Sequence, residues 1–263
     1  MRNPVFIVVF GLIVILFALL NYYIGLRGWQ TIGSYFRFNR RLYWVFFWCL
    51  TFTYIAARIV ENFLPAEISR SLVLIGSNWL GLMYYFILVI ALVDILRLLG
   101  KITGLIPKAI SDNPFAAPVT GIAVLLVVMG IWGYGLWNAY HPQVTQYNIK
   151  INKPASAVKK LHIVMISDIH LGSLVGSERL QDMVNRINVL NPDVVLFAGD
   201  TIDEDINYFK EKKMGSHFTK IKSKYGVFAV LGNHEYIGQY ADEAVRELNK
   251  AGVRVLKDDY VKV

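Results

Sequence analysis

The distribution of apolar residues divides the chain into two parts. The first 140 residues contain four apolar stretches, and each is long enough to cross a bilayer as a helix, which takes about 20 residues. These stretches run over Pro4–Ile24, Leu42–Val60, Ser71–Leu98 and Phe115–Tyr140. We therefore predict a transmembrane region of four helices over residues 1–140.

Beyond residue 140, short apolar runs alternate with amphipathic stretches. Short apolar runs bounded by turn residues are typical of buried strands, and apolar residues at helical spacing predict helices between them. Alternating strands and helices favour an α/β domain with a largely parallel sheet. The predicted strands are Leu161–Ile166, Val194–Ala198, Val227–Leu231 and Val253–Leu256; helices are predicted over Ser177–Leu190 and Tyr240–Lys250, and partly helical structure over Asp203–Lys224.

Residues 141–160 join the two parts. Thr145–Ile151 alternates polar and apolar residues, which predicts an edge strand, and Asn152–Lys160 is a polar connector. We therefore divide the chain into a transmembrane region over 1–140, a strand and connector over 141–160, and an α/β domain over 161–263.

The excess of positive charge lies mainly in the first part. Up to Tyr140 there are ten Lys and Arg against four Asp and Glu, and from His141 onward there are seventeen against fifteen. A nucleic-acid-binding protein would concentrate its positive charge on the soluble domain. We therefore expect a lipid bilayer as a partner and no nucleic acid.

Loop charge also predicts the orientation in the membrane. Two loops between the apolar stretches are basic, and positive loops stay in the cytoplasm. They contain Arg27, Arg37, Arg40 and Arg41 in the first loop and Arg97, Lys101 and Lys108 in the third. Four spans then place both termini and the α/β domain on the extracytoplasmic side. Lys150 and Lys153 oppose this orientation, although a long domain crosses largely regardless of such charges.

Two residues inside the apolar stretches stand out. Cys49 is the single cysteine, so no intramolecular disulfide can form. Asp94 is a carboxylate near the end of the third stretch, with Arg97 three residues further on. We expect an interfacial ion pair between these two side chains, with a role in an ion pathway as the alternative.

Polar side chains follow three successive predicted strands. Asp168 and His170 come after the first, Asp200 follows Gly199 after the second, and Asn233 and His234 follow Gly232 after the third. Ligands of parallel sheets bind beyond the carboxyl ends of the strands. Each residue taken alone is an ordinary turn residue, but the three sets together predict a metal site. Mixed nitrogen and oxygen ligands suit Mn, Fe, Zn or Co, and two such ions can bind a phosphate and generate hydroxide.

These motifs resemble a known family. The order Asp-x-His, Gly-Asp-x-x-Asp and Gly-Asn-His-Glu is similar to the calcineurin-like metallophosphoesterases, above all to their membrane-associated bacterial branch, whose first motif reads Ser-Asp-Ile-His-Leu-Gly as here. The resemblance implies that Asp168 and His170 hold one metal and that Asp200 bridges two. It also implies that Asn233 binds the second metal and the phosphate, and that His234 protonates the leaving oxygen.

The resemblance carries further expectations and one departure. It implies an αββα sandwich and an orienting role for Asp203. Glu235 has no clear role in the resemblance, and we expect packing or a supporting role for it. The family places a lone histidine and a Gly-His-x-His motif further downstream, and no histidine follows His234 here. We therefore expect an N-terminal fragment whose sandwich is incomplete at the C-terminus. We interpret the remaining histidines as structural or solvated, with His217 as a minor alternative ligand; they are His141, His162 and His217.

The predicted function is that of a membrane-anchored phosphoesterase in a bacterial cytoplasmic membrane. A metal-bound hydroxide would attack a phosphate mono- or diester, with a lipid phosphate, an envelope phosphodiester or a nucleotide as the substrate. The alternative is a non-catalytic membrane sensor or transport module with a degenerate phosphoesterase-like binding domain. A Gly-His-x-His motif downstream would favour catalysis.

Overall fold

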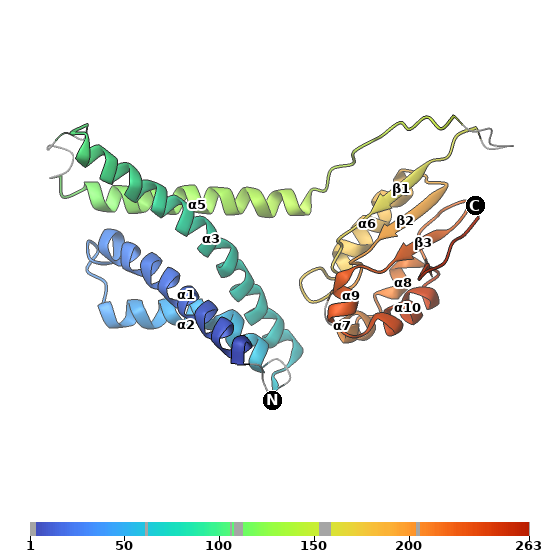
Figure 1. Cartoon of the computed structure of the whole chain (residues 1–263), viewed down its shortest axis with the longest axis horizontal. Coiled ribbons are helices and arrows are strands. Elements are labelled where there is room, and N and C mark those ends of the chain that lie inside the picture. Colours follow the sequence, from blue (N-terminus) through green and yellow to red (C-terminus); the bar gives the residue numbers. More distant parts are fainter. Residues whose placement is uncertain are drawn as a thin grey trace. The chain divides into compact units, whose positions relative to one another are not determined.

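The computed structural model describes residues 4–60, 63–105, 107, 113–152, 159–203 and 206–262. The chain forms two compact units, Met1–Tyr147 and Asn148–Val263, and we describe each by itself (Figure 1). Lys108, Lys153 and most of the predicted connector over 152–160 lie outside the described residues.

The first unit is built from long apolar helices. They are α1 (Pro4–Gly28), which continues into the π-helical turn η1 (Trp29–Gly33), α2 (Arg40–Val60), α3 (Ala66–Ile102) and α5 (Ala116–Tyr140). Four helical segments have the length and composition to cross a membrane, with mean hydropathy between 1.4 and 2.3. The four predicted spans are therefore confirmed, and the chain is that of a membrane protein.

A buried amide joins three of these helices. Asn21 of α1 is fully buried, and its Oδ1 atom accepts hydrogen bonds from Trp79 Nε1 of α3 at 3.0 Å and from Thr51 Oγ1 of α2 at 3.4 Å. Its Nδ2 atom donates to the Phe17 carbonyl at 2.9 Å. Because a buried amide is costly unless it is hydrogen-bonded, this contact specifies how α1, α2 and α3 pack.

The predicted pair of Asp94 with Arg97 is wrong. Asp94 of α3 accepts hydrogen bonds from the Tyr23 hydroxyl at 2.6 Å and from Arg27 Nη2 at 2.7 Å, both on α1. Arg97 instead donates to Thr120 Oγ1 of α5 at 2.8 Å. Side chains three apart do share a helix face, but packing of the helices brings a closer partner to each charge than the local neighbour.

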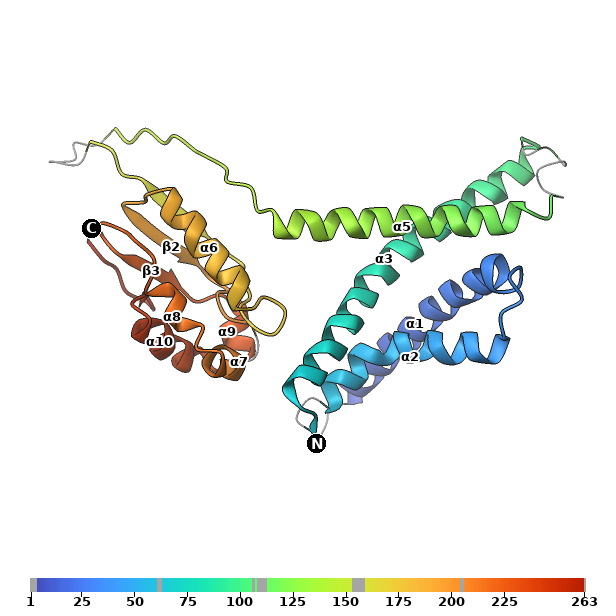
Figure 2. The same cartoon turned by 180° about the vertical axis from the view of Figure 1, so that it is seen from behind.

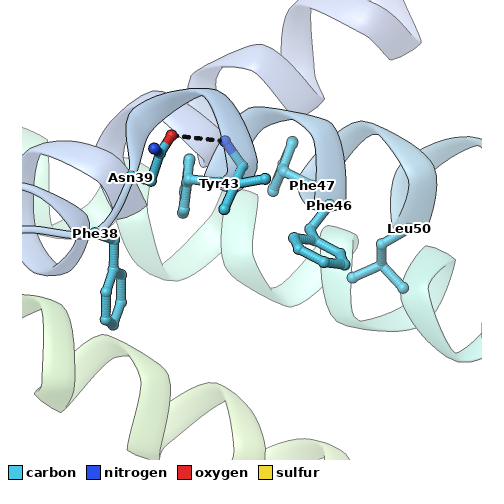
Figure 3. A pocket seen from close by; sticks show the side chains of 7 residues that line it. Phe38, Asn39, Tyr43, Phe46, Phe47 and Leu50 are labelled. Carbon is cyan, nitrogen blue, oxygen red and sulfur yellow. Dashed lines mark hydrogen bonds between the residues drawn. The ribbon is translucent and has the colours of Figure 1, made fainter.

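The surface of α2 contains an open apolar hollow of about 450 Å³, shown in Figure 3. Aromatic and aliphatic side chains line it, and its one amide, Asn39, is engaged at the start of α2, where Oδ1 accepts the backbone N–H groups of Arg41 and Leu42 at 3.0 and 3.2 Å. This is the geometry of a helix N-cap. The hollow therefore has the character of a lipid-facing surface.

The second unit is an α/β domain around one parallel sheet. Its strands follow the chain in the order β1-β2-β3-β4, and each pairs in parallel with the next. The elements are β1 (Ile163–Ile166), α6 (Ser177–Val189), β2 (Val194–Ala198), α7 (Ile206–Glu211), α8 (Gly215–Phe218), β3 (Val227–Val230), α9 (Asn233–Ile237), α10 (Ala241–Lys250) and β4 (Arg254–Val255). The four predicted strands and both predicted helices of this domain are confirmed.

Helices cover one face of this sheet (Figure 2). Val195, Phe197 and Ala229 point into a core that also contains residues of α6, α8 and α10, among them Leu180, Val184, Phe218 and Leu248. On the other face, Ile163, Met165 and Val230 are 47%, 69% and 44% exposed. The described residues therefore form one sheet of the predicted sandwich, with an uncovered apolar face.

The predicted edge strand over Thr145–Ile151 is wrong. This segment has no assigned secondary structure, and Tyr147, Ile149 and Ile151 are between 73% and 83% exposed. Alternation shows which side chains could share a face, but a strand also needs a paired neighbour, and no described strand pairs with this segment.

Candidate metal centre

The predicted site residues gather where β1, β2 and β3 end. After β1 and β2 the chain turns sharply, and Asp168, His170 and Asp200 have positive φ values of 56°, 51° and 49°. This left-handed backbone is unfavourable for residues with a Cβ, and such conformations cluster at functional sites. The turns therefore hold these three side chains in directions that a regular strand or helix would not give.

Backbone hydrogen bonds join the turns after β1 and β2. The N–H groups of His170 and Leu171 donate to the carbonyls of Asp200 and Thr201 at 2.9 and 3.0 Å, and Asp203 N donates back to the Leu171 carbonyl at 3.0 Å. The first two motifs therefore form one hydrogen-bonded unit.

Two overlapping groups of side chains could each hold a metal ion. The ligand atoms of Asp168, His170 and Asp200 lie within 4.8 Å of one another, and so do those of His170, Asp203 and His234. Among the described residues, no Lys or Arg forms an ion pair with Asp168, Asp200 or Asp203. Carboxylates gathered without a compensating cation fit a divalent ion, which would supply the missing charge.

Asp203 lies between the two histidines. Its Oδ1 atom is 3.3 Å from His234 Nδ1 and 3.9 Å from His170 Nδ1, and the two imidazole rings are 4.4 Å apart at an angle of 75°. The Tyr240 hydroxyl donates to the Asp203 carbonyl, and a Cβ on Gly172 would lie 3.1 Å from Asp203 Cβ. Asp203 therefore has little freedom to move away from the histidines.

The third motif packs directly on Asp200. His234 N donates to Asp200 Oδ1 at 2.9 Å, and a Cβ at position 232 would overlap that same carboxylate. Gly232 is therefore needed because the turns after β2 and β3 lie in contact. Asp200 itself is 8% exposed, which leaves it a narrow opening to the site.

Glu235 is the residue whose role the sequence left least defined. It is fully buried, and its Oε1 atom accepts the N–H groups of Thr201 and Ile202 at 2.8 and 3.0 Å. Its Oε2 atom accepts Gly232 N at 2.8 Å at the start of α9, as the glutamate of a capping box does. Helix α9 was not predicted from the sequence, although a glutamate three residues after the N-cap residue is a usual signal for the start of a helix. Glu235 therefore joins the second and third motifs.

The remaining polar candidates occupy separate positions. Asn233 begins α9 beside His234 and has an exposed side chain. His217 of α8 hydrogen-bonds Gln181 Oε1 at 2.9 Å, and burial, aided by the charge of Lys220, lowers its pKa. His162 donates its backbone N–H to Asp193, and His141 stacks on Trp137 at 4.6 Å.

The second unit is thus a parallel α/β domain with a candidate metal site, formed by carboxylates and imidazoles at three strand ends. Residues 161–261 match the model of the calcineurin-like phosphoesterase family. The α/β domain of this chain is thus similar to that family over most of its length.

Curated relatives carry the same domain. A transmembrane protein with a metallophosphoesterase domain from Danio rerio is 28% identical over 72% of this chain and 43% of its own length. Uncharacterized metallophosphoesterases of Aquifex aeolicus and Helicobacter pylori are each 32% identical, over 54% and 44% of this chain and 51% and 30% of their own lengths. The chain thus spans about half or less of these relatives. No solved structure matches it.

Proposed function

We propose that the α/β domain is a two-metal phosphoesterase that hydrolyses phosphate mono- or diesters. Similarity to a family of phosphoesterases supports hydrolysis in general. The observation that carries the proposal is the ligand group of Asp168, His170 and Asp200. The start of α9, with Asn233 and His234, is held against this group by the hydrogen bond from His234 N to Asp200 Oδ1. Two ions about 3.5–4 Å apart are a usual means of stabilising both the attacking and the leaving oxygen of a phosphate ester.

The side chains divide into ligands and a proton donor. Asp168, His170 and Asp200 would hold one ion, and Asp200 and the exposed amide of Asn233 would contribute to the second. Divalent ions there would neutralise phosphate charge and activate water. The hydrogen bonds that Glu235 accepts and the one that His234 N donates fix the turns that present these ligands.

His234 is placed to donate a proton to the leaving oxygen. Because its Nδ1 atom faces the Asp203 carboxylate, Nε2 is directed elsewhere and is available to a substrate. A carboxylate on one ring nitrogen fixes the ring orientation and decides which nitrogen carries the transferable proton. Asp203 therefore acts through His234 rather than on the substrate.

The test combines metal binding with turnover. The full chain in detergent is dialysed against manganese, the bound metal is counted, and hydrolysis of an aryl phosphate and a bis-aryl phosphodiester is measured. Asp200→Asn should lower the bound manganese and abolish turnover, whereas Asp182→Asn, on the exposed side of α6 and paired with Arg186, should change neither. Unchanged metal content and rate in Asp200→Asn would overturn the bridging role.

A non-catalytic binding domain is the competing proposal. Two manganese ions per chain and phosphate binding without turnover of either ester would favour it. Loss of metal together with loss of turnover in Asp200→Asn would instead support the enzyme.

We propose further that the long helices anchor the enzyme with its α/β domain on the extracytoplasmic side. The four apolar helices and the similarity to the transmembrane protein of Danio rerio support anchoring. The basic loop residues support the sidedness. A reporter that is active only outside the cytoplasm, fused after Tyr140, should be active; a cytoplasmic signal would contradict the proposed orientation.

A further inference from the structure

Five lysines lie at the end of the sheet where its strands begin. Lys159 and Lys160 precede β1, and Lys220, Lys222 and Lys224 lie between α8 and β3; all five are exposed. We call these five residues the basic edge. In Figure 1 the chain enters β1 at one end of the domain, and α7 and α9 lie at the other end, with α9 carrying His234.

Hydrogen bonds hold the loops of the basic edge together. Asn188, at the end of α6, donates to the Lys220 carbonyl at 2.9 Å and accepts Lys222 N at 2.8 Å. The Asp193 carbonyl accepts Tyr225 N at 2.8 Å, and its carboxylate accepts His162 N at 2.8 Å. The segments that lead into β1, β2 and β3 therefore form one surface.

The positive charge of this surface has little local compensation. Lys220 Nζ donates to the neutral amide of Gln181 at 3.0 Å, and Lys224 lies 4.8 Å from the centre of the Tyr225 ring. None of the five lysines forms an ion pair with an acid among the described residues. The one carboxylate in these loops, Asp193, is engaged by His162 N.

Two further cations of this end of the domain are neutralised. Lys250 pairs with Glu247 at 2.8 Å and Arg254 pairs with Asp259 at 3.2 Å. Apart from the basic edge and Asp193, residues 141–263 carry twelve Lys and Arg against fourteen Asp and Glu. The positive charge of this half is thus concentrated at the basic edge, and the carboxylates Asp168, Asp200 and Asp203 lie at the opposite edge.

We propose that the basic edge binds an anionic phospholipid surface. The chain is a membrane protein by its four long apolar helices, so a bilayer is present at high effective concentration. Exposed lysines are attracted to anionic headgroups, and their contributions accumulate when several face the same surface. A single-stranded nucleic acid would in addition need a row of aromatic platforms for its bases, and Tyr225 is the one aromatic residue in the segment 219–226.

Docking of the basic edge on a bilayer would limit which substrates the proposed phosphoesterase can reach. Strands of four to five residues place about 15 Å between the two edges of the sheet. The candidate metal centre would then face the aqueous phase. A soluble phosphate ester, or an envelope polymer reaching well beyond the headgroups, fits this distance better than the phosphate of a short lipid headgroup. The lipid-binding proposal itself does not require hydrolysis.

The test measures how closely the basic edge approaches the bilayer. The full chain carries Cys49→Ala and Ser223→Cys, so a donor dye sits on the lysine loop, and it is placed in nanodiscs with acceptor-labelled headgroups. Energy transfer should be higher with 30% phosphatidylglycerol than with phosphatidylcholine alone, and it should fall as NaCl rises from 50 to 500 mM.

Two matched triple variants distinguish the effect of the basic edge from the effect of net charge alone. Lys220→Gln, Lys222→Gln and Lys224→Gln together should reduce the docked population in anionic nanodiscs by about tenfold to a hundredfold. The control with Lys210→Gln, Lys257→Gln and Lys262→Gln removes the same net charge and should leave energy transfer unchanged. Equal transfer in both lipid mixtures, or equal losses in both triple variants, would overturn the proposal. So would salt-sensitive binding of an oligonucleotide to the basic edge with no effect of phosphatidylglycerol.

Discussion

The Glu235 carboxylate accepts the Thr201 backbone N–H at 2.8 Å, across 34 residues of sequence. The same side chain accepts Gly232 N, so one buried carboxylate satisfies donors in the turns after β2 and β3. Those turns carry Asp200 and His234, which belong to different ligand groups. The spacing between the two groups therefore depends on a residue that belongs to neither.

Replacing Glu235 with Gln should loosen both turns. An amide cannot accept hydrogen bonds on both sides, and a buried donor left without a partner costs about 1–3 kcal/mol. Hydrogen exchange measured by mass spectrometry should become faster in peptides that contain Thr201, Ile202 and Gly232. Glu247→Gln is the control, because Glu247 pairs with exposed Lys250. Unchanged exchange in Glu235→Gln would contradict the joining role.

Replacing Asp203 with Ala should separate metal binding from turnover. Loss of a partner that orients a site residue lowers activity or metal affinity by about tenfold to a hundredfold. Because Asp203 faces His234 Nδ1, we expect kcat for an aryl phosphate to fall while manganese at saturation stays bound. A variant with normal kcat and reduced metal content would show that Asp203 is a metal ligand instead.

Metal removal should destabilise the α/β domain without affecting the helical unit. An ion at 100 times its dissociation constant stabilises the folded state by about 2.7 kcal/mol. Chelation should therefore speed hydrogen exchange in the turns after β1, β2 and β3. All six tryptophans precede residue 141, so tryptophan emission during thermal unfolding reports the helical unit and should not change. A shift of that emission on chelation would show that the metal acts elsewhere.

The ion pair between Arg27 and Asp94 should stabilise the packing of α1 on α3. Arg27→Met should lower the stability of the helical unit in detergent by about 1–2 kcal/mol, because Asp94 then loses a charged partner. The double variant Arg27→Met with Asp94→Leu should recover part of that loss, since neither charge remains. Tryptophan emission during unfolding measures both effects, and strictly additive losses would show that the pair is not coupled.

The strands were predictable because each is a short, continuous apolar run bounded by polar or turn residues. Val194–Ala198 is a continuous apolar run with polar flanks, and its bounds agree with β2. Such runs are characteristic of parallel sheets. The meeting of Asp168, His170 and Asp200 followed from the rule that carboxyl ends of parallel strands share one edge.

Other features depend on partners that are distant in the sequence. The alternation of Thr145–Ile151 could not show whether a neighbouring strand exists, and Arg97 could not be excluded as a partner of Asp94 without the position of α1. The same limit applies to Glu235, whose Oε1 atom accepts N–H groups of the distant turn after β2. In each case the local pattern could not identify the partner, because packing between distant segments selects it.

The uncovered face of the sheet has a chemical consequence. Met165 is 69% exposed there, while Met214 in the core of the same domain is fully buried. Thioether oxidation to the sulfoxide follows solvent access, so peroxide should modify Met165 well before Met214. A protein segment or partner that covers this face in the cell would protect Met165 from oxidation. The oxidation rate of Met165 therefore reports whether this face of the sheet is covered.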